Sequence, residues 1–404
     1  MKILTYTTLY PNAAAPLHGI FVENRLSAML ATHPDIEAQV VAPVPWFPLP
    51  WECFRGYAQF ARCPATETRR GIKIVHPRFP AIPKLGMSIA PTLLYAATIG
   101  TVRRLLADGF DFDVIDAHYF YPDGVAAAMI ARSLGKPVTM VVHGSDITLL
   151  PRFAIPRWQI KVAARWASSI VTVSRSLKEN VAAVGVPRDK IGVSPNGADL
   201  SRFYLADRGE IRRFLGLQGP LLLSVGALIP RKSHEILISA LPLMPDVRAM
   251  IAGTGSEESR LRALARRLGV EDRVRFLGAV PQEKLCALYN AADAMVLASS
   301  REGWASVLME SMASGTPVIA SAVDGTPEAM ASPDAGIILP ERTPEALANA
   351  VRRLLSAPPD RARTRAYAER FSWARTIEDH VQRLRSSAAC RHRVSAAAPI
   401  TGTN

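Results

Sequence analysis

The sequence predicts an α/β protein built from two Rossmann-like, doubly wound domains. Its 404 residues are more than one hydrophobic core usually serves, so two domains of about 200 residues each are expected. From residue 221 onward, apolar runs of strand length alternate with segments of helical length. This alternation is typical of a parallel sheet that is covered by helices on both faces.

The individual elements follow from these runs. In the first half, β-type runs predict strands over 3–6, 37–42 and 114–117, and a helix is expected over 21–31. In the second half we expect strands over 221–225, 247–252 and 273–276, with helices starting at 233 and covering 257–268 and 282–291.

Composition excludes several classes of protein. Hydrophobic residues make up 49% of the chain, an ordinary share for a globular protein. No run of about 18 apolar residues occurs, and the N-terminus does not read as a signal peptide, so we expect a cytoplasmic protein. The four cysteines have neither CxxC spacing nor paired histidines, and we interpret them as free thiols.

The net charge of +13 favours anionic partners. Phosphates and acidic lipid headgroups fit this charge. A nucleic-acid partner is not expected, because the chain has no zinc finger, no aromatic RNA-binding strand signature and no basic helix repeat.

The most informative stretch covers residues 301–317. An apolar run predicts a strand over 294–297, and the segment 307–314 has a helix-like apolar face that should end at Gly315. Glu302 is therefore expected in the loop after a strand, and Glu310 inside the next helix. The N-terminus of such a helix offers unpaired N–H groups to an anion, so the two glutamates can flank one bound phosphate group.

Other candidate positions also follow predicted strands. The loop 226–232 ends in Arg231 and Lys232, which at a helix start indicates an anion site. The segment 136–146 is a β-branched strand followed by a polar turn, which places His143 at the end of the strand. The segment 253–255 does not complete a dinucleotide fingerprint, because residue 258 is Glu.

Together, the segments 301–317, 143–146 and 191–199 resemble the retaining glycosyltransferases of family 4, which have the two-domain GT-B fold and act in polysaccharide and envelope-glycan biosynthesis. The resemblance spans roughly residues 1–385. It implies that Glu302 meets the hydroxyls of the donor sugar and that Glu310 holds the ribose. It also implies that His143 contacts the transferred sugar and that Lys232 stabilises the departing diphosphate.

The resemblance extends to residues around these positions. Many relatives carry Gly-Arg where this chain has Gly226-Ala227, so we expect Arg231 to take over part of the diphosphate contact. The resemblance implies three further contacts with the nucleotide sugar. Gly19 would approach the donor from its loop, and Arg275 and Phe276 would lie against the nucleotide base. Backbone N–H groups between the two glutamates would hold the diphosphate, at Gly303, Trp304, Ala305 and Val307.

The predicted organisation has four parts. Residues 1–203 form an acceptor-binding domain, 204–372 a nucleotide-sugar-binding domain, 373–385 a helix that crosses back, and 386–404 a disordered tail of small, polar and basic residues. The expected activity is that of a retaining hexosyltransferase. Its donor would be a nucleoside diphosphate sugar, with uridine or guanosine as base, and its acceptor a lipid-linked or oligosaccharide glycan.

Two proline-rich segments, 43–64 and 77–91, are expected at the surface. They are either irregular loops folded against their own domain or an apolar, basic lip for a lipid-linked acceptor or an anionic membrane. The second alternative gives a protein that binds peripherally at the inner face of the membrane.

No cofactor and no metal site are expected. Asp111 and Asp113 form an Asp-x-Asp pair ahead of the strand over 114–117, but no further acidic ligand is near in sequence, so we interpret them as structural. Competing hypotheses for the function are a sugar-nucleotide epimerase or a phosphorylase on the same fold, and a non-catalytic sugar-nucleotide-binding subunit of a polysaccharide assembly complex.

Overall fold

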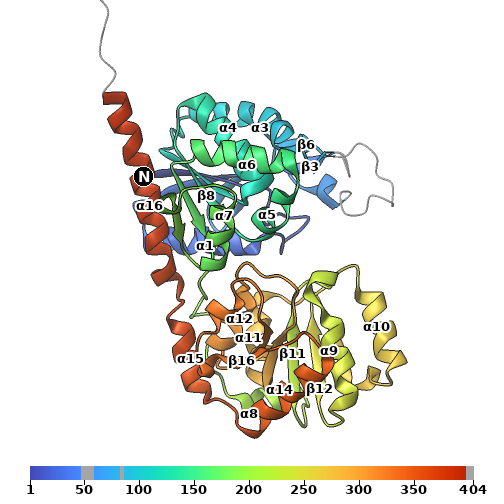
Figure 1. The fold of residues 1–404 in the computed structure, drawn as a ribbon. Helices are drawn as coiled ribbons and strands as arrows, with labels where there is room; N and C mark the ends of the chain where they lie inside the picture. The colour runs from blue at the N-terminus through green and yellow to red at the C-terminus, as the bar shows by residue number, and fades with distance from the viewer. Residues whose placement is uncertain (47–58, 82–85, 397–404) are drawn as a thin grey trace, which may run out of the picture. The chain divides into compact units, whose positions relative to one another are not determined.

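The computed structural model describes residues 1–46, 59–81 and 86–396, with the side chains of 59 and 390–396 left out (Figure 1). The chain forms two compact units, of which unit 1 comprises Met1–Pro195 and Thr376–Asn404 and unit 2 comprises Asn196–Arg375. The boundaries fall at 195/196 and 375/376 rather than at the predicted 203/204 and 372/373. In each unit, helices cover both faces of a mainly parallel sheet, which confirms the predicted fold class.

Unit 1 is organised around a sheet whose order, within the described residues, is β10-β9-β8-β7-β1-β2-β5-β4. All neighbouring strands are parallel except the antiparallel hairpin of β4 with β5. The strands are β1 Lys2–Tyr6, β2 Glu37–Val41, β4 Thr66–Arg69, β5 Ile72–Val75, β7 Val114–His118, β8 Val138–Val142, β9 Ser169–Thr172 and β10 Ile191–Val193.

The helices of unit 1 pack on the two faces of this sheet. They are α1 Ile20–Thr32, α3 Ala90–Ala107, α4 Val125–Leu134, α5 Ser145–Thr148, α6 Ala154–Trp166, α7 Arg175–Ala183 and α16 Trp373–Ala396. Every residue of β7 and β8 is buried, as expected for central strands that have helices on both faces.

Unit 2 has the sheet order β13-β12-β11-β14-β15-β16 in the part of the chain that is described, and all pairs are parallel. Its strands are β11 Leu221–Val225, β12 Arg248–Ala252, β13 Val274–Gly278, β14 Ala294–Leu297, β15 Val318–Ser321 and β16 Gly336–Leu339. Its helices are α8 Arg208–Phe214, α9 His234–Ala240, α10 Glu258–Arg267, α11 Gln282–Ala291, α12 Ser306–Ala313, α13 Thr326–Ala329, α14 Pro344–Ser356 and α15 Arg361–Glu369.

Helix α16 corrects the prediction for the C-terminus. It continues to Ala396 instead of ending at 385, so residues 386–396 are not a disordered tail, whereas 397–404 lie outside the described residues. Ile377, Val381 and Leu384 form a fully buried stripe. Beyond them, Ser387 Oγ lies 3.1 Å from Thr139 Oγ1 of β8. The small side chains that suggested disorder are those that let the helix approach the sheet closely.

The proline-rich segments contain regular structure that the sequence did not predict. Strands β3 (Val44–Trp46) and β6 (Arg78–Pro80) pair in parallel as a small sheet, and the 3-10 turn η2 (Gln59–Arg62) lies between them in sequence. Val44, Phe60 and Cys63 form a buried apolar cluster. The described part of these segments is thus partly folded into unit 1, although half of the Trp46 surface is exposed. Residues 47–58 and 82–85 lie outside the description.

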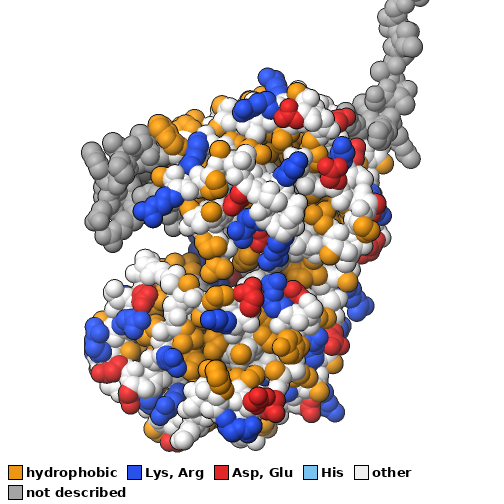
Figure 2. All heavy atoms as spheres, turned by 180° about the vertical axis from the view of Figure 1, so that it is seen from behind, with side chains coloured by type: hydrophobic (Ala, Val, Ile, Leu, Met, Phe, Trp, Pro, Cys, Tyr) orange, Lys and Arg blue, Asp and Glu red, His pale blue; other side chains and the backbone are white. Residues whose placement is uncertain are grey.

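None of the helices in the described residues is both long and apolar enough to span a bilayer. The described thiols of Cys63 and Cys286 are free and buried. Figure 2 shows one face of the molecule, on which Lys and Arg side chains alternate with Asp and Glu instead of forming one basic stripe.

Candidate active site

Four of the predicted site residues, Arg231, Lys232 and Glu302 in unit 2 and His143 in unit 1, lie in loops that follow the carboxyl ends of strands. In unit 2 the order of strands reverses between β11 and β14, and in unit 1 it reverses between β1 and β7. In open α/β sheets, ligands bind in the crevice at such a switch point, because the loops leave the sheet there in opposite directions. The two loops of unit 2 that follow β11 and β14 contain Lys232 and Glu302.

A partly buried ion cluster of Glu302, Lys232 and Arg231 joins these two loops, and we call it the Glu302 cluster. Lys232 Nζ donates to Glu302 Oε1 at 2.5 Å, and Arg231 Nη1 lies 3.3 Å from Oε2. The Glu302 side chain is buried, and burial opposes its charge, but Lys232 and Arg231 outweigh this effect and lower its pKa. Two cations meet one carboxylate, so the cluster keeps an excess of positive charge.

Backbone contacts fix the geometry of this cluster. The Ser300 N–H donates to the Arg231 carbonyl at 2.8 Å, which ties the two loops together. The Glu302 N–H donates to Asp324 Oδ2 at 2.9 Å. The Arg231 side chain also donates to the Arg301 carbonyl at 2.8 Å, so it is directed toward Glu302 rather than free in solvent.

Glu310 on α12 has a different environment. Its side chain is buried, and the hydroxyl of Tyr289 on α11 donates to Oε2 at 3.0 Å. Burial raises the pKa of Glu310 to about 7, and the Tyr289 hydrogen bond only partly offsets this effect. The pKa values of the two glutamates are therefore shifted in opposite directions, because Glu302 is paired with cations whereas Glu310 is buried beside a neutral phenol. The role of Tyr289 was not apparent from the sequence.

The glycines of segment 253–255 lie directly against the backbone of the loop after β11. A Cβ on Gly253 would lie 1.9 Å from the Gly226 carbonyl oxygen, and one on Gly255 would lie 2.3 Å from that of Leu228. Leu228 N–H donates to the Thr254 carbonyl at 2.9 Å. This segment is thus not a dinucleotide fingerprint, and its glycines permit a close approach of two loops.

The predicted backbone positions Gly303, Trp304, Ala305 and Val307 surround the start of α12. Ala305 is the N-cap, and no side chain caps the helix there. The Trp304 side chain is buried, donates from Nε1 to the Asn196 carbonyl at 2.9 Å and packs on Phe371. Trp304 can therefore take part only through its backbone, because its indole is used in packing.

Arg275 and Phe276 lie on β13, the edge strand of unit 2. Phe276 packs against the hydrophobic core, and the guanidinium of Arg262 lies 4.5 Å from the centre of its ring. Arg275 is exposed. The expected contact of this segment with a nucleotide base stays a prediction, and the contacts of Phe276 are those of a packing residue.

In unit 1, His143 follows β8 as predicted. The turn after it is held by the buried Asp146, whose carboxylate accepts from Gly144 N–H at 2.7 Å and from Phe120 N–H at 2.7 Å. The ring of His143 contacts Phe21, with centroids 4.8 Å apart, and lies nearly coplanar with His118 at 5.3 Å. Burial, with the neighbouring Arg25 guanidinium acting in the same direction, holds the pKa of His143 well below its ordinary value.

Gly19 precedes α1 with a φ of 65°, and a Cβ at this position would lie 2.2 Å from the Leu9 carbonyl oxygen. The position requires glycine because its own chain approaches closely. The expected approach to a donor at Gly19 remains a prediction.

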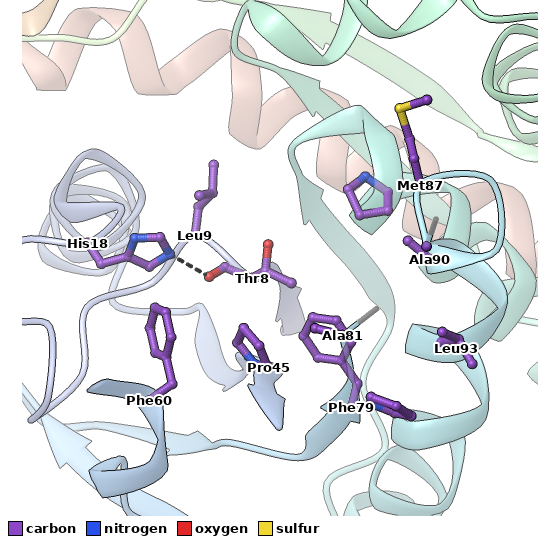
Figure 3. Close-up of a pocket in the computed structure, with 13 residues that line it drawn as sticks. Thr8, Leu9, His18, Pro45, Phe60, Phe79, Ala81, Met87, Ala90 and Leu93 are labelled. Atoms are coloured by element: carbon purple, nitrogen blue, oxygen red, sulfur yellow. Dashed lines mark hydrogen bonds between the residues drawn. The ribbon is translucent and has the colours of Figure 1, made fainter. Parts of the chain in front are cut away.

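A cavity of about 410 Å³ opens beside the loop after β1 (Figure 3). Figure 3 shows His18 and Phe60 on one side and Met87, Ala90 and Leu93 on the other. The lining is mainly apolar, and His18 Nε2 lies 3.0 Å from the Thr8 carbonyl oxygen. The buried Asp123 accepts from Thr8 N–H at 2.7 Å and so fixes the loop.

Two groups of acidic and histidine residues bear on metal binding. Asp111 pairs with Lys136, and Asp113 Oδ2 accepts from Lys2 N–H at 2.8 Å, so these two carboxylates have separate partners. Within the described residues, Asp116, His118 and His380 lie close enough together to share an ion. This group was not predicted, because His380 lies far from Asp116 and His118 along the chain.

Solved structures with this architecture define the class of protein. The chain is similar to sucrose-phosphate synthase from Thermosynechococcus elongatus, with a TM-score of 0.78 and 21% identity over 96% of this chain and 99% of the other. It is also similar to HepE of Anabaena, solved in complex with UDP-glucose, with a TM-score of 0.72 and 21% identity over 96% of this chain and 100% of the other. The fold is that of the GT-B glycosyltransferases.

Sequence comparisons identify the family. Residues 207–371 match the family model of glycosyl transferases group 1, and residues 55–202 match that of glycosyltransferase family 4. TuaC of Bacillus subtilis, named for teichuronic acid biosynthesis, is 30% identical over 87% of this chain and 89% of its own length. D-inositol 3-phosphate glycosyltransferase of Acidothermus cellulolyticus is 32% identical over 71% of this chain and 70% of its own. The chain belongs to the family 4 glycosyltransferases.

Proposed function

We propose that this glycosyltransferase is a retaining, metal-independent hexosyltransferase that moves a sugar from a nucleoside diphosphate sugar to a lipid-linked or oligosaccharide acceptor. The similarity to TuaC favours a role of this transfer in exopolysaccharide or cell-envelope glycan biosynthesis. The similarity to HepE, which was solved with UDP-glucose, favours a uridine diphosphate donor. The observation that carries the proposal is the Glu302 cluster.

The cluster suits a donor whose leaving group is a diphosphate. Lys232 and Arg231 come from the loop after β11, and the unpaired N–H groups at the start of α12 come from the loop after β14. A diphosphate that enters would share the two cations with Glu302, and their charge would stabilise the anion that forms when the glycosidic bond breaks. Glu302 would then accept hydrogen bonds from hydroxyls of the sugar.

Retention of configuration fits the partners of Glu302. A carboxylate that is held by Lys232 and Arg231 is a weak nucleophile, since both of its oxygens are engaged. We therefore assign it to binding and not to a covalent intermediate. The incoming hydroxyl would attack from the face of the leaving group, and the phosphate oxygen would take its proton.

The acceptor side of the proposal depends on the cavity in Figure 3. Its volume of about 410 Å³ lies within the ordinary range for small-molecule sites. Its side chains Phe60, Phe79, Met87 and Leu93 are apolar, which suits an acceptor with a hydrophobic portion better than a free polar sugar.

A membrane contact would place such an acceptor within reach. Phe153, Ile155 and Trp158 on unit 1 are each more than half exposed, at 51%, 53% and 64%. Arg152 and Arg157 are exposed in the same segment. Aromatic side chains next to cations suit an anionic bilayer surface. Of the residues expected to form a lip, Phe47 and Trp51 lie outside the described residues.

The test is a pair of substitutions in the two glutamates. Glu302→Ala should lower kcat far more than nucleotide affinity, whereas Glu310→Ala should lower nucleotide affinity. The expected loss of kcat in Glu302→Ala is about 10- to 100-fold, as for a hydrogen bond to a charged group, and the expected loss of nucleotide affinity in Glu310→Ala is about 2- to 10-fold, as for a neutral hydrogen bond. Binding of the nucleoside diphosphate by calorimetry and turnover of the donor give the two readouts. Glu341→Gln, at an exposed acid of unit 2, is the matched control.

Other results would contradict the proposal. Equal effects of both substitutions on nucleotide binding would refute the division of roles. Tight nucleotide binding without hydrolysis or transfer from any donor would favour a non-catalytic binding subunit. Interconversion of the donor without release of nucleotide would favour an epimerase.

A further inference from the structure

Four residues from three segments of unit 1 form a chain of contacts that ends at His143. Asp116 and His118 are two residues apart on β7, so their side chains leave the strand on the same face. His118 Nε2 lies 3.2 Å from Asp116 Oδ2, and His380 Nε2 of α16 lies 3.0 Å from the same oxygen. His118 Nδ1 lies 3.1 Å from His143 Nε2.

The positions of the ring protons on His118 and His380 follow from the Asp116 carboxylate that both rings face. Asp116 is fully buried, and although burial opposes its charge, His380 and His118 hold its pKa well below the ordinary value. An ionised carboxylate can only accept, so both histidines donate to it from Nε2. His380 Nδ1 has no hydrogen-bond partner, so an N–H there would be a buried, unsatisfied donor. His380 is therefore neutral, with its proton on Nε2.

The position of the ring proton on His143 depends on that of His118, because the two rings face each other. When neutral His118 carries its proton on Nε2, its Nδ1 is an acceptor, and the atom that faces it, His143 Nε2, must donate. A neutral His143 then has a lone pair on Nδ1. The charged neighbours fit a neutral ring, since the buried guanidinium of Arg25 on α1 acts on both Asp116 and His143.

We propose that Asp116 and His118 are positioning residues that fix the tautomer of His143, so that His143 Nδ1 accepts a hydrogen bond from a hydroxyl of the transferred sugar. His380 completes this arrangement from the C-terminal helix. The inference rests on the proposed function, because it assigns His143 to the sugar. An acceptor at Nδ1 orients a hydroxyl so that its O–H points toward the ring, whereas an N–H at the same place would donate to the hydroxyl oxygen and reverse the direction of the hydrogen bond.

A metal ion in this cluster would give the opposite result. An ion held by Nε2 of both His118 and His380 requires lone pairs on these atoms. The proton of His118 would then lie on Nδ1 and would be donated to His143 Nε2. His143 would in turn carry its proton on Nδ1, so the two arrangements predict opposite tautomers.

The first experiment reads the tautomer directly and needs no substrate. The full-length protein is labelled with ¹⁵N-histidine, and the ring nitrogens of His143 are identified from the spectrum of His143→Gln. We expect a pyrrole-type signal for Nε2 and a pyridine-type signal for Nδ1. The reverse pattern, or one equivalent of tightly bound metal in elemental analysis, would overturn the proposal even if the enzyme is an active glycosyltransferase.

The second experiment uses two substitutions that divide the functions of His118. Asn places its amide oxygen near the position of Nδ1, so His118→Asn keeps an acceptor for His143 and loses the contact with Asp116. Gln reaches the position of Nε2, so His118→Gln keeps the donor to Asp116 and loses the acceptor. We expect His118→Gln to lower kcat about tenfold, the size of one hydrogen bond, and His118→Asn to keep most of kcat.

Two readouts separate positioning from a structural role. The affinity for the nucleoside diphosphate should be unchanged in both variants, because its predicted site lies in unit 2, and Asp108→Asn, at an exposed acid of unit 1, should behave like the wild type. If His118→Asn is impaired as much as His118→Gln, the acceptor that faces His143 is not what supports turnover, and the proposal is wrong. If the wild type transfers no sugar, the proposed function fails, whereas the tautomer is still decided by the first experiment.

Discussion

Replacing Glu310 by Gln should make the stability of unit 2 less dependent on pH. Burial raises the pKa of Glu310 from the ordinary 4.5 to about 7. The two values differ by about 2.5, which corresponds to roughly 3 kcal/mol at 1.36 kcal/mol per unit. Glu310 is buried, so solvent does not screen this effect as it would at the surface.

The sign follows from the order of ionisation. Below about pH 4.5 the carboxyl is neutral in both the folded and the unfolded chain. As the pH rises, the unfolded chain loses this proton first, so the stability that neutral Glu310 confers is lost progressively up to about pH 7. Relative to wild type, Glu310→Gln should therefore gain about 2 to 3 kcal/mol of stability between pH 5 and pH 8.

Thermal and urea unfolding at several pH values measure this difference. The comparison cancels the contribution of Asp123 in unit 1, whose pKa is also raised to about 7 by burial, because both proteins keep it. A gain of this size should raise Tm by roughly 2–4 °C per kcal/mol. Glu341→Gln should show no such trend. If the difference between Glu310→Gln and wild type does not change with pH, Glu310 is not a buried neutral acid.

Three further predictions concern the loops and the surface. Arg231→Ala and Lys232→Ala should each weaken nucleoside diphosphate binding and should act non-additively, because both contact Glu302; strict additivity in a double-mutant cycle would contradict their shared role. Gly253→Ala should weaken the same binding and lower the stability by about 1 to 3 kcal/mol, because a backbone φ of 149° strains any residue with a side chain. Unchanged unfolding in urea would argue against a structural role of Gly253 in this loop. Trp158→Ser should reduce cosedimentation with anionic liposomes, whereas Phe214→Ser, at an exposed aromatic residue of unit 2, should not; equal binding of both variants would remove Trp158 from the membrane contact.

The fold could be predicted because its signal is local. Strands such as β8 and β11 are apolar except for one hydroxyl residue each, and the observed bounds of α11, Gln282–Ala291, are those predicted. Arg231 and Glu302 were both placed after strands, and these strands proved to be neighbours, but the ion pair between the two side chains was not predicted. In parallel sheets, the carboxyl ends of neighbouring strands bring such loops together.

The parts that could not be predicted depend on contacts between distant segments. The packing of the buried Trp304 side chain on Phe371 is a tertiary contact, whereas the position of Trp304 in the motif had suggested only a contact with the nucleotide sugar. The C-terminal helix was predicted to end too early, because composition does not show that Ser387 meets Thr139 of β8. The same helix brings His380 to Asp116, a pairing that spacing along the chain does not indicate.

The most direct test of the central claim is a real-time ¹H NMR measurement of donor turnover in the presence of a chelator. The donor would be the nucleoside diphosphate hexose that stabilises the protein most in a thermal shift screen, where a ligand at 100 times its Kd adds about 2.7 kcal/mol. We expect the anomeric proton of the first product to keep the configuration of the donor, at a rate that EDTA does not change and that Glu302→Ala lowers at least tenfold. An inverted product, or activity that EDTA abolishes and Mn²⁺ or Mg²⁺ restores, would contradict the account.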